Sequence, residues 1–173
     1  MQPLIRPELP EDLPQVHELL LQAFGQSEES LLVDSLRKSR SHIPELTFVA
    51  EQDGKIVGFL MLTHATVVSR KSQFLCLLLS PMAVRPEVQK TGIGRALVAH
   101  AIQSATELGF PAIAVLGHPT YYPKFGFQPA SNWGIYPSID APEEAFMLLP
   151  LKQGAMEGIH GMLKWDHAFD SVT

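Results

Sequence analysis

Residues 84–97 read Val84-Arg85-Pro86-Glu87-Val88-Gln89-Lys90-Thr91-Gly92-Ile93-Gly94-Arg95-Ala96-Leu97. They lead from an apolar strand pattern through a Gln-x-x-Gly-x-Gly loop into a helix pattern. Glycines at 92 and 94 would let backbone N–H groups approach an anion closely, and the helix N-terminus adds unpaired donors and the positive end of its dipole. Lys90 and Arg95 add positive charge. The stretch therefore predicts a cradle for a pyrophosphate, with a simple tight turn as the structural alternative.

A second motif follows the next apolar strand pattern. Ile113 to Leu116 leads to Tyr122-Pro123-Lys124-Phe125-Gly126-Phe127. The order strand, helix, strand over Phe74 to Leu116 predicts a right-handed crossover between parallel strands, with the anion site outside their carboxyl ends. With this motif present, ligand binding is favoured over a bare glycine turn.

A dinucleotide site is a competing interpretation of Gly92-Ile93-Gly94. The dinucleotide fingerprint needs a third glycine, but Leu97 stands there, and no Asp or Glu lies near the expected ribose-binding distance. The sequence therefore argues against a dinucleotide site.

Together the two motifs resemble the GCN5-related N-acetyltransferases (GNAT). The acetyl-coenzyme A motif of that family is Gln/Arg-x-x-Gly-x-Gly/Ala after a strand ending in Val, and every defining position is present from Gln89 to Gly94. A tyrosine just before a Gly-Phe pair is also common there, and Tyr122 occupies that place. The chain also resembles a group of predicted bacterial acetyltransferases that share Gly-x-Pro-x-x-Tyr-x-Lys/Arg-Phe-Gly-Phe, here Gly117 to Phe127. The resemblance runs from about Leu4 to roughly the end of the chain.

The resemblance implies an α/β fold of mixed α+β type, with a central mixed, mostly antiparallel sheet, splayed parallel strands and flanking helices. We expect one domain over residues 1–173, with a core at 3–151 and a C-terminal strand or tail at 152–173. A chain of 173 residues that is 46% hydrophobic can bury such a core.

Residue periodicity predicts the individual elements. Helices are expected from Pro10 to Gly25, from Ser27 to Arg40 and from Gly92 to Leu108. Strands are expected at Leu4–Arg6, Thr47–Ala50, Ile56–Val68, Phe74–Val84, Ile113–Leu116, Ala145–Leu151 and, more weakly patterned, Ile159–Trp165, with a hairpin turn at Asp53-Gly54 and a long loop from Ser131 to Glu144.

Pro81 interrupts the strand that precedes the glycine loop. Proline cannot donate to a ladder, so it indicates a bulge or a place where the sheet opens. In the resembled family the corresponding strand splays from its neighbour, and the thioester arm lies in the gap.

The resemblance also implies the reaction, which is direct attack of a primary amine on the thioester of acetyl-CoA while both substrates are bound. Backbone groups of Met82, Ala83 and Val84 would pair with the pantetheine arm, and an N–H there could stabilise the oxyanion. Tyr122 would give a proton or a hydrogen bond to the leaving thiolate. The pyrophosphate would be held by the amides of Gln89, Lys90, Thr91, Gly92, Ile93, Gly94 and Arg95.

A general base is harder to assign, because the strand from Phe74 to Val84 contains no carboxylate. His118 follows a strand end near the expected gap, and imidazole titrates near neutral pH, so it is the candidate base. Orientation of the substrate, or a loop cap before Pro119, are its alternatives. Glu28 and Glu29 are rival groups, although carboxylates in a first helical turn typically face solvent.

Composition excludes several classes. A net charge of −5 argues against a general nucleic-acid surface. We expect no membrane partner and a cytoplasmic protein, because no apolar run is long enough to span a bilayer. A lone cysteine, Cys76, excludes an intramolecular disulfide and is expected to be buried and inert, and the histidines lack ligand spacing, so no metal is expected.

The acceptor is left as an unidentified amine, on a small molecule or a protein, and homodimer formation is left open. A non-catalytic module that binds acyl-CoA is the alternative function, although Tyr122 favours chemistry.

Overall fold

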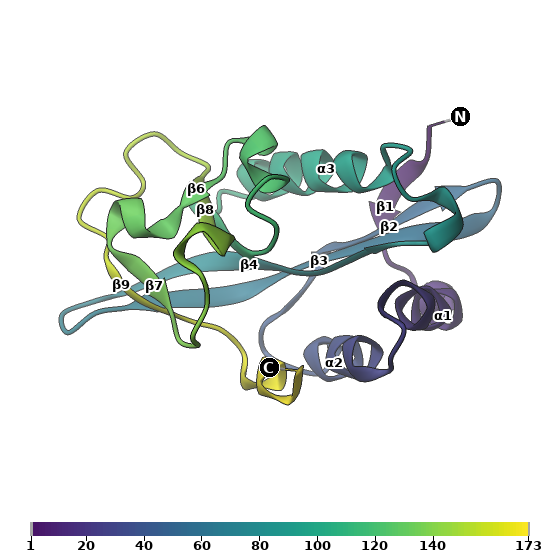
Figure 1. The fold of residues 1–173 in the computed structure, drawn as a ribbon, viewed down its shortest axis with the longest axis horizontal. Coiled ribbons are helices and arrows are strands. Elements are labelled where there is room, and N and C mark those ends of the chain that lie inside the picture. Colours follow the sequence, from purple (N-terminus) through teal and green to yellow (C-terminus); the bar gives the residue numbers. More distant parts are fainter. Residues whose placement is uncertain (1, 173) are drawn as a thin grey trace.

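The computed structural model describes residues 2–172, and one mixed sheet organises the fold (Figure 1). In the described chain its strands run in the order β1-β2-β3-β4-β5-β8-β6, while β9 pairs with β3 and β7 pairs with β9. Only β4–β5 and β7–β9 are parallel among the pairs in residues 2–172. The strands are β1 (Leu4–Pro7), β2 (His42–Gln52), β3 (Lys55–Val68), β4 (Gln73–Val84), β5 (Ala112–Leu116), β6 (Gln128–Pro129), β7 (Ile135–Pro137), β8 (Phe146–Pro150) and β9 (Gly161–Lys164). The expected mixed, mostly antiparallel sheet is confirmed.

Helices cover both faces of this sheet. In Figure 1, α3 (Ile93–Glu107) lies on one face, and α1 (Leu13–Phe24) and α2 (Glu28–Arg37) lie on the other. The helix predicted to open at Pro10 begins as the 3₁₀ turn η1 (Pro10–Asp12) before α1. Gly25 and Gly109, with φ of 69° and 89°, follow α1 and α3 in the left-handed conformation that ends many helices.

Strands β4 and β5 separate after a short parallel contact. Their register contains only Leu77 opposite Ile113 and Leu78 opposite Ala114. Just beyond, Leu62 of β3 faces Leu79 and Leu60 faces Met82, so two residues of β4, one of them Pro81, oppose a single residue of β3. The bulge and the opening expected at Pro81 are both confirmed.

The hairpin between β2 and β3 also follows the prediction. Asp53 and Gly54 have φ of 54° and 76°, and two successive left-handed residues give the turn whose twist matches paired strands.

The loop prediction for Ser131 to Glu144 is wrong in part. The segment contains β7 and parts of the 3₁₀ turns η4 (Ala130–Trp133) and η5 (Glu143–Ala145). Ile135 is buried and β7 pairs with β9, so contacts with the distant C-terminal segment order residues that local composition marks as loop.

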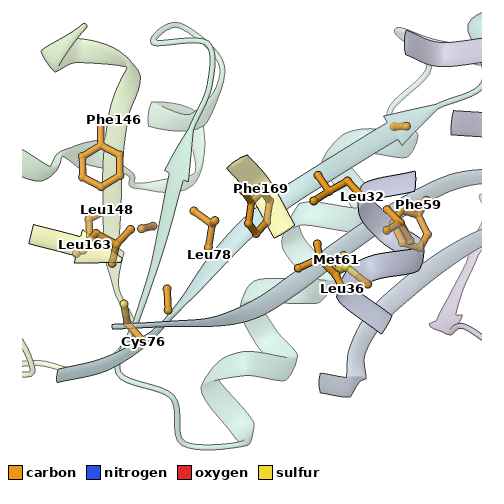
Figure 2. Packing of buried hydrophobic residues seen from close by; sticks show 14 of the residues in the cluster. Leu32, Leu36, Phe59, Met61, Cys76, Leu78, Phe146, Leu148, Leu163 and Phe169 are labelled. Atoms are coloured by element: carbon orange, nitrogen blue, oxygen red, sulfur yellow. The ribbon is translucent and has the colours of Figure 1, made fainter. Parts of the chain in front are cut away.

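The strand expected within Ile159 to Trp165 is confirmed as β9, which pairs with β3. After it, the 3₁₀ helix η6 (His167–Val172) brings Phe169 into the core beside Leu32 of α2 (Figure 2). The C-terminal residues therefore complete the α1–α2 side of the sheet. The division of the chain at residue 152 stays a prediction.

Cys76 lies fully inside this core (Figure 2), and burial raises the pKa of its thiol to about 12. Since the thiolate is the reactive form, a rise from the reference value of 9.0 predicts roughly 10³-fold slower reaction with a disulfide reagent at neutral pH. The test is the reagent's rate on native protein against protein unfolded in urea. Equal rates would contradict the burial.

Candidate functional site

A cavity of about 740 Å³ opens where β4 and β5 separate. This volume lies within the range typical of small-molecule sites. We call it the first cavity. Its lining residues come from the end of α1, the end of β4, the glycine loop, the start of α3 and the segment after β5: Ala23, Phe24, Met82, Ala83, Val84, Gln89, Lys90, Gly92, Gly94, Arg95, His118, Tyr121, Tyr122 and Lys124.

The glycine loop is shaped by left-handed backbone. Lys90 and Gly92 have φ of 65° and 97°. Left-handed residues turn neighbouring N–H groups to one side and form anion-binding concavities, and a non-glycine residue held there carries strain of order 1 kcal/mol. The Gln89 amide donates to the Val84 carbonyl at 3.1 Å, and the Thr91 hydroxyl donates to the Val88 carbonyl at 2.5 Å. These two bonds hold the curved loop against the end of β4.

The N-terminus of α3 faces this loop with open donors. Gly92 is its cap residue, and within residues 2–172 no side chain caps that end. Lys90, Arg95 and Lys124 line the first cavity, and its described lining includes no Asp or Glu. Open amides, the helix dipole and three cations together fit a di-anionic group.

Gly94 keeps the cavity open. A Cβ at this position would lie 3.3 Å from the Tyr121 hydroxyl oxygen and 3.7 Å from Val84. A branched side chain there would occupy the space between the loop and the tyrosine.

Tyr122 is the most buried of the polar groups expected to act. It is 7% exposed, and burial, followed by the neighbouring Tyr121, raises its pKa to about 12. Its ring packs edge-on against Tyr121 and Phe127 at centroid distances of 5.1 and 5.5 Å. A Cβ at Gly117 would come within 2.5 Å of the ring, so that position needs glycine. At neutral pH the hydroxyl therefore keeps its proton and can donate.

Tyr121 acts in part as a packing residue. It contacts Tyr122 and Phe125 with its ring and takes the Lys124 ammonium over its face at 5.6 Å. It also lines the first cavity.

Of the residues predicted to bind the cofactor, some line the first cavity and others do not. Met82, Ala83, Val84, Gln89, Lys90, Gly92, Gly94 and Arg95 line the first cavity. Thr91 and Ile93 are outside the lining set, and Ile93 is buried in the core against the sheet. The role predicted for Thr91 and Ile93 uses their backbone amides. The positions of their side chains do not test that role, so it stays a prediction.

The three candidate general bases lie in different surroundings. His118 is exposed and lines the first cavity. Glu28 is exposed, and it lies outside the residues that line the cavities described here. Glu29 is half-buried and lines an adjoining cavity of about 230 Å³, which we call the second cavity. The Glu29 carboxylate thus borders the second cavity, while its hydrogen bonds to Gln26 lie at the exposed surface.

Phe24, Met82 and Tyr122 line both cavities. The two spaces thus adjoin where β4 and β5 separate, with Tyr122 between them. Phe24 comes from the end of α1, and its contribution was missed because its spacing also fits a core helix face.

Arg85 was also missed, although it lies inside the motif stretch. It is 1% exposed, and its guanidinium donates to the Ile56 carbonyl at 2.6 Å and to Gln22 of α1 at 3.2 Å, with Glu18 3.6 Å away. It joins α1 to β3 at the end of β4. A charged residue next to a cation-rich motif gives no sign that it is buried.

Residues 13–127 match the acetyltransferase (GNAT) family. The chain belongs to this family. It is 38% identical to the uncharacterized N-acetyltransferase YjhQ of Escherichia coli K12 over 134 residues, which cover 77% of this chain and 74% of YjhQ. It is 30% identical to the uncharacterized N-acetyltransferase YhbS of the same strain over 168 residues, which cover 96% of this chain and 98% of YhbS. The resemblance inferred from the motifs is confirmed.

Solved structures agree with the fold. The crystal structure of Escherichia coli YhbS in complex with CoA has a TM-score of 0.90 and 27% identity, covering 98% of this chain and 93% of that one. A GNAT acetyltransferase from Brucella melitensis in complex with acetyl-CoA has a TM-score of 0.76 at 24% identity, covering 97% and 98% of the two chains, which shows the shared fold.

Residues 2–172 hold no group of three or more His, Cys, Asp or Glu side chains placed to bind a metal ion. Each helix in that range is too short or too polar to cross a membrane.

Proposed function

We propose that this protein transfers the acetyl group of acetyl-CoA to a primary amine while both substrates are bound. The carrying observation is one cavity that joins an anion site at the start of α3 to the buried hydroxyl of Tyr122, across the opening between β4 and β5. Relatives crystallised with CoA and acetyl-CoA support this cofactor. Residues 1–173 would form a single domain acting in the cytoplasm.

The anion site would hold the pyrophosphate through the amides of residues 89–95, assisted by Lys90, Arg95 and Lys124. The pantetheine arm would follow the edge of β4 at Met82, Ala83 and Val84, because the β5 register stops at Leu78 and leaves that edge open. This path leads the thioester toward Tyr122.

The chemistry balances without a further reactant. The ammonium loses one proton, and the free amine attacks the thioester carbonyl carbon. An N–C bond forms, the C–S bond of the tetrahedral intermediate breaks, and the nitrogen loses its second proton. The products are the acetamide and CoA thiol, with one proton released to solvent. His118 at the first cavity and Glu29 at the second are the candidate proton acceptors.

Tyr122 would act by hydrogen bonding. Its pKa of about 12 exceeds the roughly 8.5 of a free thiol, so complete proton transfer to the thiolate would be uphill by about 5 kcal/mol. A hydrogen bond from the hydroxyl stabilises the developing thiolate without that cost.

Thermal unfolding with acetyl-CoA, CoA or NAD tests the cofactor. Acetyl-CoA at 100 times its dissociation constant should stabilise the fold by about 2.7 kcal/mol, and NAD should not. Gly94→Val should abolish the shift because the branched side chain enters the cavity beside Tyr121 and Val84.

Ala99→Val, on an exposed position of the same helix, is the matched control and should keep the shift. A shift with NAD alone, or a full acetyl-CoA shift in Gly94→Val, would contradict the proposed cofactor site. A shift without turnover on any amine would favour the alternative, a non-catalytic acyl-CoA module.

A further inference from the structure

The second cavity combines apolar side chains with one carboxylate in its described lining. Its walls include six apolar side chains from α2, β4, β5 and η6: Leu32, Leu79, Pro81, Val115, Leu116 and Phe169. Leu32, Leu79 and Val115 are at most 3% exposed, so the inner wall belongs to the core. Among the described residues that line this cavity, Glu29 is the single charged one.

The Glu29 carboxylate has a hydrogen-bond partner at the surface. The Gln26 amide nitrogen lies 3.0 and 3.2 Å from its two oxygens and donates to them. A carboxylate beside apolar side chains can pair with one ammonium.

The first cavity is lined by positive charge, whereas the second cavity is lined by the negative charge of Glu29. Lys90, Arg95 and Lys124 line the first cavity and would repel an ammonium, whereas Glu29 would attract it. Since Tyr122 and Met82 lie between the two spaces, an amine in the second cavity would meet a thioester arriving from the first.

We propose, resting on the acetyl transfer proposed above, that the second cavity selects acceptors whose primary amine adjoins a compact apolar group, with Glu29 binding the ammonium. A volume of about 230 Å³ lies below the usual small-molecule range and suits a group the size of one amino-acid side chain. Phe169 of η6 packs beside Leu32 in the core (Figure 2), and both side chains line this cavity.

Polyamines fit this cavity poorly. The described lining offers no second carboxylate to pair with a second ammonium, and an ammonium that leaves water without a partner of opposite charge is costly. A monoamine places its one charge at Glu29 and its carbon body against the walls.

The test measures amine binding to the CoA-bound protein by calorimetry, so it does not depend on turnover. The probes are 2-phenylethylamine, putrescine and a short peptide with an N-terminal leucine. We expect 2-phenylethylamine to bind at least 10-fold more tightly than putrescine. If the peptide binds more tightly than 2-phenylethylamine, the acceptor is the N-terminal amine of a peptide or protein. If the peptide binds more weakly, the acceptor is a small free amine.

Two test variants and one control variant separate the effect of charge from the effect of size. Glu29→Gln should weaken 2-phenylethylamine binding at least 10-fold, while Glu28→Gln, one residue earlier and exposed, should not. Leu116→Trp should weaken it by filling the cavity from a position that is 38% exposed and tolerates bulk. CoA binding should be unchanged in all three.

Equal or tighter binding of putrescine, equal effects of the two glutamate variants, or no amine binding to the CoA complex would each overturn the inference. Amine binding as expected without acetyl transfer would overturn the proposed catalysis and leave the amine selectivity standing. The two failures are therefore distinguishable.

Discussion

Tyr122→Phe is expected to lower acetyl transfer about 100-fold and to leave acetyl-CoA binding unchanged. The substitution removes only the hydroxyl, while the ring keeps its packing against Tyr121, Phe127 and Gly117. A donor aimed at charge that develops in the transition state contributes about 10²–10³ in rate, and binding of the ground state does not use it. Steady-state rates with an amine accepted by the wild type, beside the acetyl-CoA thermal shift, measure the two effects separately.

The remaining tyrosines supply the controls. Tyr136→Phe alters an exposed residue on β7 and should keep full activity. If Tyr121→Phe lost the activity and Tyr122→Phe kept it, the neighbouring phenol would be the donor.

The pH profile gives a second check on Tyr122. Its raised pKa of about 12 means that the donor is lost only as the pH approaches 12, so no tyrosine-dependent fall in rate is expected near pH 10. The same shift makes folding oppose ionisation, so stability due to Tyr122 is full below pH 10 and declines between about 10 and 12. The alkaline loss of stability should be smaller in Tyr122→Phe.

Local signals predicted the elements that frame the site. The glycine loop, the start of α3 and the Asp53-Gly54 turn are each set by a few neighbouring residues, with left-handed conformations at Gly92, Asp53 and Gly54. Pro81 marked the bulge because proline removes one ladder donor. Such features depend on chain geometry within a few residues and are visible in the sequence.

Features that depend on distant contacts were not visible. β7 forms because β9 lies beside it, more than 20 residues later in the chain. Glu29 of α2 lines the second cavity together with residues of β4 and β5, whereas its neighbour Glu28 faces solvent with the same local pattern. Helix periodicity alone does not place either carboxylate relative to another element.

Arg85→Ala is expected to lower the free energy of unfolding by about 2–4 kcal/mol. The register shift between Ala50 and Glu51 of β2 marks an irregularity opposite Ile56. The Arg85 side chain donates to the Ile56 carbonyl, and the Gln15 side chain accepts from the Ile56 N–H at 2.9 Å. Removing the guanidinium leaves a buried carbonyl without this donor, and the lost side chain leaves a cavity, which together account for the expected size.

Urea unfolding of Arg85→Ala, Arg85→Lys and Arg70→Ala separates these causes. Arg70 is exposed, so its replacement should change stability by less than about 0.5 kcal/mol. Lysine has one ammonium and cannot reach both the Ile56 carbonyl and Gln22 with the fork geometry of arginine, so Arg85→Lys should fall between the wild type and alanine. The ion pair with Glu18 adds little because that carboxylate is 58% exposed. Equal stability of Arg85→Ala and the wild type would show that α1 is held on β3 without this residue, and the end of α1 at the two cavities would then be positioned by core packing alone.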